Sequence, residues 1–151
     1  MNLSAYFKRI GYEGPARADL EMLNALIEAH VRAVPFENLD IHAERPVENT
    51  VEAAFDQIVT QGQGGWCYEM NGLFGWVLSE IGFDVTRLAA GVRRGKLGDA
   101  ALGNHLCLMV RLAGVEYLVD VGFGGSQISA ISLAHAETLH PPVRMALVPL
   151  Q

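Results

Sequence analysis

The sequence predicts an α+β fold in which a helical N-terminal half precedes a run of β-strands. Between residues 1 and 83, apolar side chains recur at steps of three and four, which is the spacing of one helix face. From Asp84 onward the spacing becomes two, which is typical of strands. Because helices and strands are segregated along the chain rather than alternating, the pattern favours α+β over α/β.

Four helices are predicted in the first half, and each has a boundary signal. Gly11 and Pro15 separate the first from the second, and Pro35 ends the second because proline disfavours a helical residue before it. Thr50 can cap the third, and Gly82 ends the fourth. The predicted helices are Asn2–Ile10, Ala18–Val34, Val51–Val59 and one whose apolar stripe runs over Met70–Ile81, and the segment Phe36–Val47 is expected to be irregular.

Five strands are predicted in the second half, with a polar loop over residues 93–104 between the first two. They are Val85–Val92, His105–Leu112, Val115–Val121, Ile128–Ser132 and Val143–Leu150.

A chain of 151 residues suits one domain, or two small ones that share a core. We divide it into a helical domain, residues 1–83, and a strand domain, residues 84–151.

Cys67 occupies the most informative position in the chain. It follows the glycine pair Gly64-Gly65 closely and stands in the first turn of the fourth helix. Unpaired backbone N–H groups and the helix dipole favour a negative charge there, so a thiolate is favoured too. Cys67 is therefore a candidate nucleophile, although a cysteine at a helix start is more often a small buried apolar residue.

The turn Ala113-Gly114 fixes which strand residues face each other. A two-residue hairpin loop there places Cys107 opposite Asp120 and His105 opposite Gly122. Side chains two apart share a sheet face, so His105 and Asp120 become diagonal neighbours within reach of each other. A carboxylate in an apolar hairpin is costly to bury unpaired. The sequence therefore predicts a His105–Asp120 pair.

Together, Cys67, His105 and Asp120 have the components of a cysteine triad. Cys67 is the expected nucleophile, His105 takes its proton or holds it as an ion pair, and Asp120 orients and stabilises the charged imidazole. Backbone N–H groups near Cys67 would form an oxyanion hole. A thiolate that attacks a carbonyl gives a thioester, so acyl transfer or acyl hydrolysis is the expected reaction class.

Plainer interpretations of the same residues stay open. His105 can be an ordinary strand residue, and Asp120 can cap the turn that follows it. Cys107 shares their sheet face, and we interpret it as core filler because it starts no helix. A metal site of Cys67, His105 and Cys107 is a weaker alternative, since no Cys-x-x-Cys or His-Glu-x-x-His spacing is present, and no metal is predicted.

Composition argues against several classes of function. Half of the residues are apolar and 19% are charged, so the chain can bury a core. A net charge of −6 and the lack of a Lys/Arg-rich run argue against nucleic-acid binding, and we interpret Arg93–Lys96, the densest basic spot, as a solvated loop. No apolar run approaches the roughly 18 residues of a membrane helix, and the N-terminus lacks signal-peptide order. A soluble cytoplasmic protein is expected, and two cysteines fit a reducing compartment.

Four motifs, in order along the chain, resemble those of the arylamine N-acetyltransferases. They are Pro35–Leu39, Gly64–Asn71, Asn104-His105 and Val119–Gly124. The opening stretch Tyr6–Tyr12 is also similar to bacterial members of that family. The motifs are spread over most of the chain, which makes the resemblance specific.

The resemblance implies a helical bundle followed by an antiparallel β-barrel-like domain, with a cysteine-protease-like core. It implies a triad at Cys67, His105 and Asp120, the residues already reached. It also implies a two-step reaction in which acetyl-CoA acetylates the cysteine and an aromatic amine or hydrazine then takes the acetyl group. Phe36 and Phe123 would line the acceptor pocket, where a flat apolar wall suits an aryl ring.

Gln63 departs from the family pattern, in which an arginine usually precedes the glycine pair. The resemblance implies that this arginine pairs with the glutamate that corresponds to Glu37. Glutamine cannot form that ion pair, and loss of one charge from a buried pair is destabilising. We therefore expect a weakened joint between the two domains.

Length is the second departure from the family pattern. Family members continue into a third, α/β domain that helps to build the acetyl-CoA cleft, and this chain ends at Gln151. We expect that domain to be absent, the triad to be assembled and acetyl-CoA binding to be impaired. We also expect the last strand to leave an unpaired edge through which copies of the chain could associate.

The sequence is consistent with three hypotheses for function. The first is an arylamine N-acetyltransferase. The second is another Cys-His-Asp thiol enzyme, such as a transglutaminase-like amidase or peptidase, and the third is a non-catalytic binding module with a truncated cleft. The Pro35–Leu39 motif favours the first over the second, because general thiol hydrolases have no need of it, whereas the missing C-terminal region favours the third.

Overall fold

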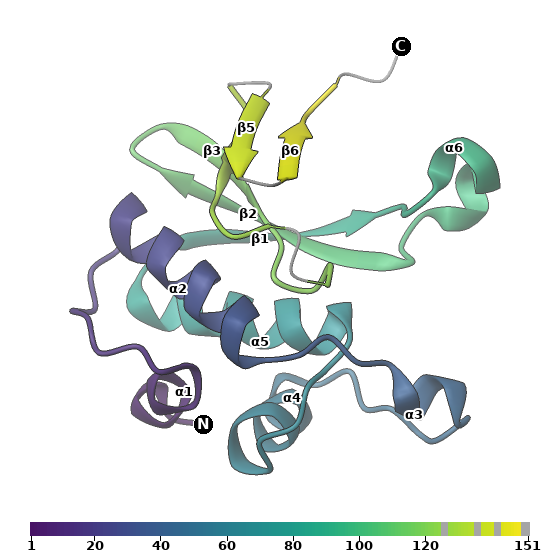
Figure 1. Cartoon of the computed structure of the whole chain (residues 1–151), viewed down its shortest axis with the longest axis horizontal. Coiled ribbons are helices and arrows are strands. Elements are labelled where there is room, and N and C mark those ends of the chain that lie inside the picture. The colour runs from purple at the N-terminus through teal and green to yellow at the C-terminus, as the bar shows by residue number, and fades with distance from the viewer. Residues whose placement is uncertain (125–126, 135–136, 141–142, 149–151) are drawn as a thin grey trace.

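The protein has the predicted order of helices followed by strands (Figure 1). A computed structural model describes residues 1–124, 127–134, 137–140 and 143–148. The helices of the first half are α1 (Leu3–Ile10), α2 (Leu20–Ala33), α3 (Leu39–His42), α4 (Val51–Phe55) and α5 (Cys67–Ile81). The mixed α+β class predicted from the sequence is confirmed.

Short polar side chains and glycine set the helix boundaries. The side chains of Asn2 and Asp19 accept hydrogen bonds from backbone N–H groups in the first turns of α1 and α2. Thr50 does the same for α4, as predicted. Gly82 ends α5 at a φ of 106°, a conformation that side chains disfavour. These local signals explain why the predicted helix ends lie close to the observed ones.

The main sheet is antiparallel, with strand order β1-β2-β3-β4. Its strands are β1 (Asp84–Ala90), β2 (His105–Leu112), β3 (Val115–Val119) and β4 (Ile131–Ser132). Leu112 lies opposite Val115 and Leu108 opposite Val119, which is the register predicted from the two-residue turn. That turn places both of its residues at positive φ, as right-twisted hairpins require.

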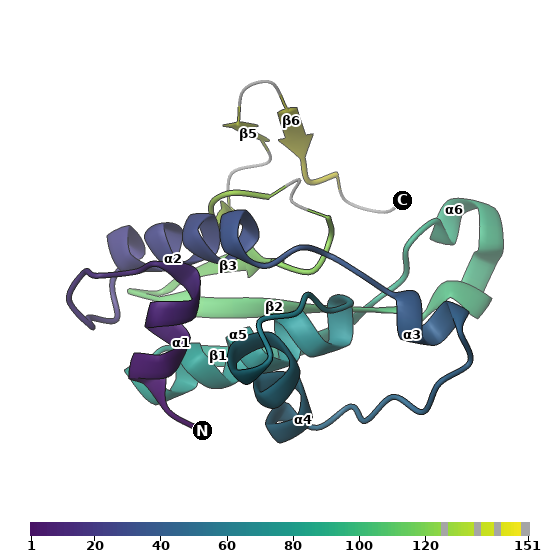
Figure 2. The ribbon, with the colours of Figure 1, turned by 60° about the horizontal axis from the view of Figure 1, so that its bottom comes forward.

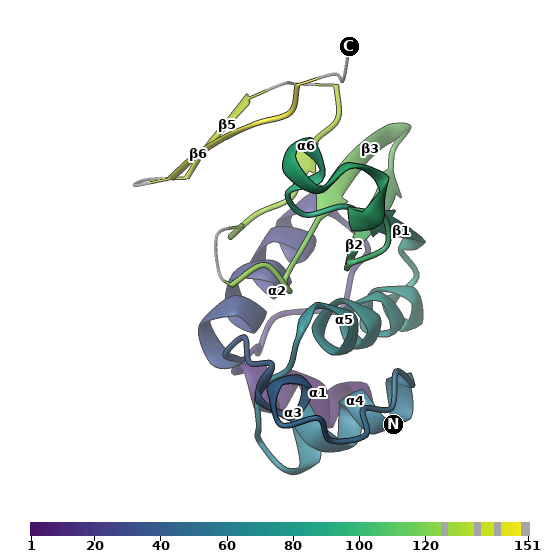
Figure 3. The same cartoon turned by 90° about the vertical axis from the view of Figure 1, so that its right-hand side faces the viewer.

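A separate hairpin, β5 (Glu137–His140) and β6 (Val143–Ala146), stands away from the main sheet (Figure 3). Within the described residues the main sheet is open, with β1 and β4 at its edges, so the strands do not close into the barrel-like arrangement that the resemblance implies. The predicted strand Val143–Leu150 is observed only as far as Ala146, and its residues Pro149 and Leu150 lie outside the described residues.

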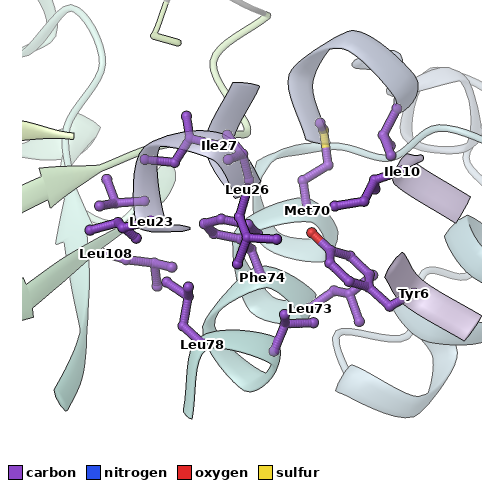
Figure 4. Close-up of a cluster of buried hydrophobic side chains, with 14 of the residues drawn as sticks. Tyr6, Ile10, Leu23, Leu26, Ile27, Met70, Leu73, Phe74, Leu78 and Leu108 are labelled. Carbon is purple, nitrogen blue, oxygen red and sulfur yellow. The ribbon is translucent and has the colours of Figure 1, made fainter. Parts of the chain in front are cut away.

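Helix α5 forms the centre of the core, between the main sheet and helices α1 and α4 (Figures 3 and 4). Its side chains Leu73, Phe74 and Leu78 are fully buried. A Cβ at Gly75 would lie 3.3 Å from Leu108 Cδ2, so this glycine lets the helix approach β2 closely. The close packing holds the start of α5, and therefore Cys67, against the strand that begins at His105.

Three segments differ from the sequence prediction. The predicted loop over 93–104 contains two short helical turns, α6 (Arg94–Leu97) and η2 (Gly98–Ala101), and the segment predicted as irregular contains α3. The third predicted helix ends early and continues as a π-helical turn, η1 (Asp56–Thr60). Elements this short have no full period of apolar residues, so periodicity cannot identify them.

The strand predicted over Ile128–Ser132 is reduced to two paired residues, β4. Just before it, the buried side chain of Gln127 donates hydrogen bonds to the carbonyls of Leu118 and Ser129, each at 2.8 Å. The Leu118 carbonyl of β3 therefore accepts its hydrogen bond from a side chain and not from the backbone of a longer strand.

His30 is a buried histidine that the candidate site does not use. It is fully buried in the core, its Nδ1 lies 2.7 Å from the hydroxyl of Tyr6, and its ring packs edge-on against Phe74. Burial, with a smaller contribution from the charge of Arg9, lowers the pKa of His30 to about 3. The native state therefore holds this imidazole neutral.

The buried histidine predicts a loss of stability in mild acid. Below pH 6.5 the unfolded chain protonates His30 but the native state does not, so the free energy of unfolding should fall by up to about 1.4 kcal/mol per pH unit. Urea unfolding between pH 7 and 5.5 measures this slope. His42 is exposed, so the change of unfolding free energy with pH should be the same in His42→Gln as in the wild type. It should become smaller in His30→Leu. Equal slopes in both variants would contradict the assignment.

Candidate active site

The stretch before Cys67 is held by backbone pairing with the segment that carries Phe36. The Glu37 N–H donates to the Gly65 carbonyl at 3.0 Å, and the Gly65 N–H donates to the Pro35 carbonyl at 3.2 Å. A Cβ at Gly64 would lie 2.2 Å from the same Pro35 oxygen, which no side chain can tolerate. Two of the sequence motifs are thus joined directly, and the joint places Phe36 beside Cys67.

Arg9 is a structural residue whose role no sequence pattern predicts. Its guanidinium donates to the carbonyls of Ala33 and Ile58, both at 2.8 Å, and to those of Gly62 and Gln63, both at 3.2 Å. Four carbonyls from the end of α2, the turn η1 and the loop before Cys67 therefore share one cation. No local pattern identifies this role, because the nearest of these partners is 24 residues away in the sequence.

The side chain of Gln63 points to solvent, whereas Glu37 is half-buried near Glu69. Burial raises the pKa of Glu69 despite its hydrogen bonds to Trp66 and Gln57, and the charges of Asp40 and Glu37 raise it further. The joint between the motifs is thus acidic. Because Glu37 is only half-buried, the loss of its arginine partner should cost less than in a fully buried pair.

Gln63→Arg is expected to stabilise this joint. A guanidinium at position 63 can pair with Glu37, and we expect the free energy of unfolding to rise by about 0.5–1 kcal/mol. Gln63→Lys is the matched control, since it adds the same charge without the bidentate fork and should gain less. Thermal unfolding of the three proteins measures the effect. If the stability of Gln63→Arg is no higher than that of the wild type, Glu37 does not need this partner.

Cys67 begins α5 and is 6% exposed. Within the first turn of the helix, Glu69 Oε2 accepts a hydrogen bond from the Trp66 N–H at 3.1 Å and so anchors the helix start. The backbone N–H groups of the first turn have no partner within the helix itself. The predicted position of the thiol at a helix N-terminus is therefore the observed one.

His105 and Asp120 form the predicted pair. His105 Nε2 lies 2.6 Å from Asp120 Oδ2, and the side chain of Cys67 is close enough to the imidazole to raise its pKa. His105 is the first residue of β2, and Asp120 is the first residue after β3, one position beyond the ladder. The hairpin thus presents both side chains at one end of the sheet, next to the start of α5.

Asn71 holds the carboxylate of Asp120 in place, a role that was not predicted from the sequence. Its side-chain amide donates to Asp120 Oδ1 at 2.9 Å and to the Leu106 carbonyl at 2.7 Å, and its oxygen accepts from the Val121 N–H at 3.0 Å. Asn71 is completely buried and stands four residues after Cys67, one helical turn along. The sequence feature that could have indicated this role is an amide side chain on a helix face that is otherwise apolar.

The two cysteines have different surroundings. Burial lowers the pKa of His105, but the hydrogen bond and charge of Asp120 and the nearby Cys67 side chain outweigh it, so the pKa rises to about 9. His105 is thus held as an imidazolium beside Cys67 at neutral pH. Burial and the charge of Asp120 raise the pKa of Cys107 to about 11, so that thiol stays protonated. This agrees with the interpretation of Cys107 as filler.

A cavity of about 400 Å³ opens onto Cys67. Phe36 and Phe123 line it together with Cys67 and His105, and the two phenyl side chains are 43% and 50% exposed. The Phe123 ring packs edge-on against His105, with ring centroids 5.3 Å apart. The structure thus brings the five predicted site residues together. Phe36, Cys67, His105 and Phe123 line this cavity, and Asp120 lies behind them, hydrogen-bonded to His105.

A second cavity, of about 370 Å³, is lined by both His105 and Asp120 and shares Val92 and Phe123 with the first. Among the described residues no group of three or more His, Cys, Asp or Glu side chains could hold a metal ion. In the same part of the chain, no helix is long and apolar enough to cross a membrane.

Comparison with known proteins gives consistent matches. A family model described as N-acetyltransferase matches residues 19–146. An arylamine N-acetyltransferase of Mycolicibacterium smegmatis is 43% identical over 156 residues, which cover 100% of this chain and 53% of the relative. Arylamine N-acetyltransferase 2 of Mus musculus is 41% identical over 83% of this chain and 44% of its own length.

Solved structures give the same result. The M. smegmatis arylamine N-acetyltransferase superposes with a TM-score of 0.88 at 41% identity, over 100% of this chain and 58% of that one. The Mycobacterium marinum enzyme in complex with CoA superposes with a TM-score of 0.80 at 39% identity, over 89% of this chain and 51% of that one. This chain spans about half the length of the relatives it matches.

Proposed function

The chain belongs to the arylamine N-acetyltransferase family, and we propose that it transfers an acetyl group from acetyl-CoA to an arylamine or arylhydrazine through a thioester on Cys67. The observation that carries the proposal is the position of His105. It hydrogen-bonds Asp120 at 2.6 Å and lines the same cavity as Cys67, whose walls also include the side chains of Phe36 and Phe123.

The first half-reaction acetylates Cys67. The imidazolium of His105 holds the thiolate of Cys67 as an ion pair, and the sulfur forms a bond to the acetyl carbonyl carbon. The bond from that carbon to the sulfur of CoA breaks, and His105 gives its proton to the departing CoA thiolate. Because Nε2 of the imidazole is hydrogen-bonded to Asp120, Nδ1 is the ring nitrogen that is left to exchange a proton at Cys67.

The second half-reaction transfers the acetyl group to the amine. The amine nitrogen attacks the thioester carbon, neutral His105 takes the proton that the nitrogen loses, and Cys67 leaves as a thiolate. The imidazolium–thiolate pair is thereby restored. Asp120 stabilises the positive imidazole at each stage, and Asn71 and the Gly122 N–H keep its carboxylate oriented.

Two further features suit this chemistry. The negative charge that develops on the carbonyl oxygen can be stabilised by the backbone N–H groups of the first turn of α5, which form an oxyanion hole beside Cys67. Phe36 and Phe123 offer flat apolar surfaces to an aryl ring at the cavity wall. We therefore assign the cavity that opens onto Cys67 to the acceptor.

Steady-state turnover tests the proposal. The chain is mixed with acetyl-CoA and an arylhydrazine, and the release of CoA thiol and the N-acetyl product are measured together. Thiol release that requires the hydrazine, with one product per thiol, supports acetyl transfer. Release of thiol without the hydrazine would indicate a thiol hydrolase instead, and no release at any acetyl-CoA concentration would favour a non-catalytic module.

A further inference from the structure

Helix α5 and strand β2 lie side by side, and both begin at the end of the molecule where α6 projects (Figures 1 and 2). Cys67 is the first residue of the helix, and His105 is the first residue of the strand. The two side chains that react with each other are therefore carried by the starts of two different elements. The distance between them depends on what holds the start of the strand against the start of the helix.

The start of β2 is paired with a neighbouring strand on one side. His105 lies opposite Ala90 of β1, whereas the pairing of β2 with β3 reaches only as far as Leu108 opposite Val119. Across the described residues, 105–107 therefore pair with β1 but not with β3. The end of a strand opens more readily than the middle of a sheet. Contacts from outside the sheet therefore decide where His105 lies.

Two side chains of α5 supply such contacts, one before His105 and one after it. The Tyr68 hydroxyl donates a hydrogen bond to the carbonyl of Gly103. The Asn71 amide donates a hydrogen bond to the carbonyl of Leu106 at 2.7 Å. Tyr68 directly follows the nucleophile in the sequence, and Gly103 stands two residues before the histidine. The hydrogen bond of Tyr68 thus joins the immediate surroundings of the two reacting groups.

Both partners in the Tyr68 hydrogen bond are themselves held in place. The Gly103 N–H donates to the Ala90 carbonyl at the end of β1, at 3.0 Å. Gly103 has a φ of 79°, a left-handed conformation that glycine adopts without strain. The ring of Tyr68 packs at a tilt against the ring of Trp66, with ring centroids 4.9 Å apart. The donor and the acceptor therefore meet in one fixed arrangement.

We propose that Tyr68 is a positioning residue that sets the spacing between Cys67 and His105, an inference that rests on the proposed roles of those two residues. Its hydroxyl holds residues 103–105 against the start of α5 and so keeps the imidazole beside the sulfur. Without the hydroxyl, His105 keeps its hydrogen bond to Asp120 and moves away from Cys67. The ion pair becomes weaker, and the thiol loses its proton less readily. Tyr68 acts through the backbone and takes no part in the bonds that form and break.

The pH dependence of Cys67 alkylation by iodoacetamide tests the proposal, because the thiolate is the reactive form. Tyr68→Phe removes the hydroxyl and keeps the ring. The midpoint of its pH profile should lie at higher pH than in the wild type. At a given pH below that midpoint, its rate constant should be about fivefold lower, the effect of one lost hydrogen bond. Peptide mass spectrometry locates the adduct on Cys67.

A purely structural role for Tyr68 gives a different result. Loss of the hydroxyl would then lower the melting temperature and leave the pH profile of alkylation unchanged. Thermal unfolding is therefore measured on the same preparations. An unchanged profile in Tyr68→Phe would overturn the proposal, whatever the change in melting temperature.

Tyr12→Phe is the matched control. The Tyr12 hydroxyl also donates to a backbone carbonyl, that of Pro15 at 3.1 Å, but it does so in the segment between α1 and α2. This variant should keep the wild-type profile. Equal shifts in Tyr12→Phe and Tyr68→Phe would contradict the proposal, because the effect would not depend on the hydrogen bond beside Cys67.

Gly103→Ala approaches the same hydrogen bond from its acceptor. Among the described residues, a Cβ at this position would meet nothing within 4 Å, so the change acts through the left-handed backbone alone. It should raise the midpoint as Tyr68→Phe does. The double variant should show no further rise, since both changes break one hydrogen bond. Additive shifts would mean that the two residues act on Cys67 separately and would contradict the proposal.

Alkylation requires no acetyl donor, so its result is independent of the proposed acetyl transfer. If the wild type shows the expected alkylation profile but releases no thiol from acetyl-CoA, the proposed function is wrong and the role of Tyr68 stands. If the wild type transfers acetyl groups and Tyr68→Phe has an unchanged profile, the role of Tyr68 is wrong and the proposed function stands. A midpoint at the ordinary value for a thiol in the wild type would count against both.

Discussion

Asp120→Asn is expected to slow acetylation of Cys67 by about a thousandfold or more. The carboxylate at 2.6 Å is one of the two partners that keep His105 charged at neutral pH. An amide at this position cannot stabilise an imidazolium, so the pKa of His105 falls and the ion pair with Cys67 is lost. The measurement is the rate of appearance of the acetylated protein by mass spectrometry.

The matched control for this variant is Asp84→Asn, which removes an exposed carboxylate that pairs with Arg111 on the surface of the sheet. It should keep the wild-type acetylation rate and lose little stability. If Asp120→Asn also kept a rate near that of the wild type, Asp120 would be a structural residue, and the triad would be reduced to a Cys67–His105 pair.

Gly122→Ala is expected to damage both the fold and the chemistry. A Cβ at this position would lie 2.7 Å from Cys67 Cα and 2.7 Å from Asn71 Nδ2, closer than van der Waals contact permits. The backbone after β3 must therefore move away from α5, which separates Asp120 from Asn71. We expect a loss of about 1–3 kcal/mol in the free energy of unfolding and an acetylation rate at least about a hundredfold lower.

Gly95→Ala is the control for this substitution. Gly95 lies in α6, where a new Cβ would meet nothing within 4 Å, so both stability and rate should be retained. Urea unfolding and the acetylation rate are measured on the same preparations. A Gly122→Ala protein as stable and as fast as the wild type would show that α5 and the turn after β3 do not pack as tightly as described.

The hairpin is the part of the site that local sequence determines most completely. A two-residue turn allows one register, and this register brings His105 and Asp120 to the same end of the sheet. Cys67 could be placed at a helix start because a glycine pair and an apolar stripe bound that helix. These features depend on neighbours a few residues away, which a single sequence displays.

The supporting residues could not be predicted in the same way. Arg9 and Asn71 act on partners that are 24 to 54 residues distant in the sequence, and no period or spacing encodes such contacts. The turns α6 and η2 are too short to show periodicity, and the ion pair between Arg94 and Asp99 helps to hold them. The sequence therefore indicated which residues could react, and the structure was needed to show what positions them.

Cys67 is the residue that accepts the acetyl group in the proposed reaction. Intact and peptide mass spectrometry after incubation with excess acetyl-CoA tests it most directly. We predict a gain of about 42 Da, the mass of one acetyl group, on the peptide that carries Cys67, and its loss when an aromatic amine is added. Acetylation of Cys107 in place of Cys67, or an adduct that the amine does not remove, would contradict the account.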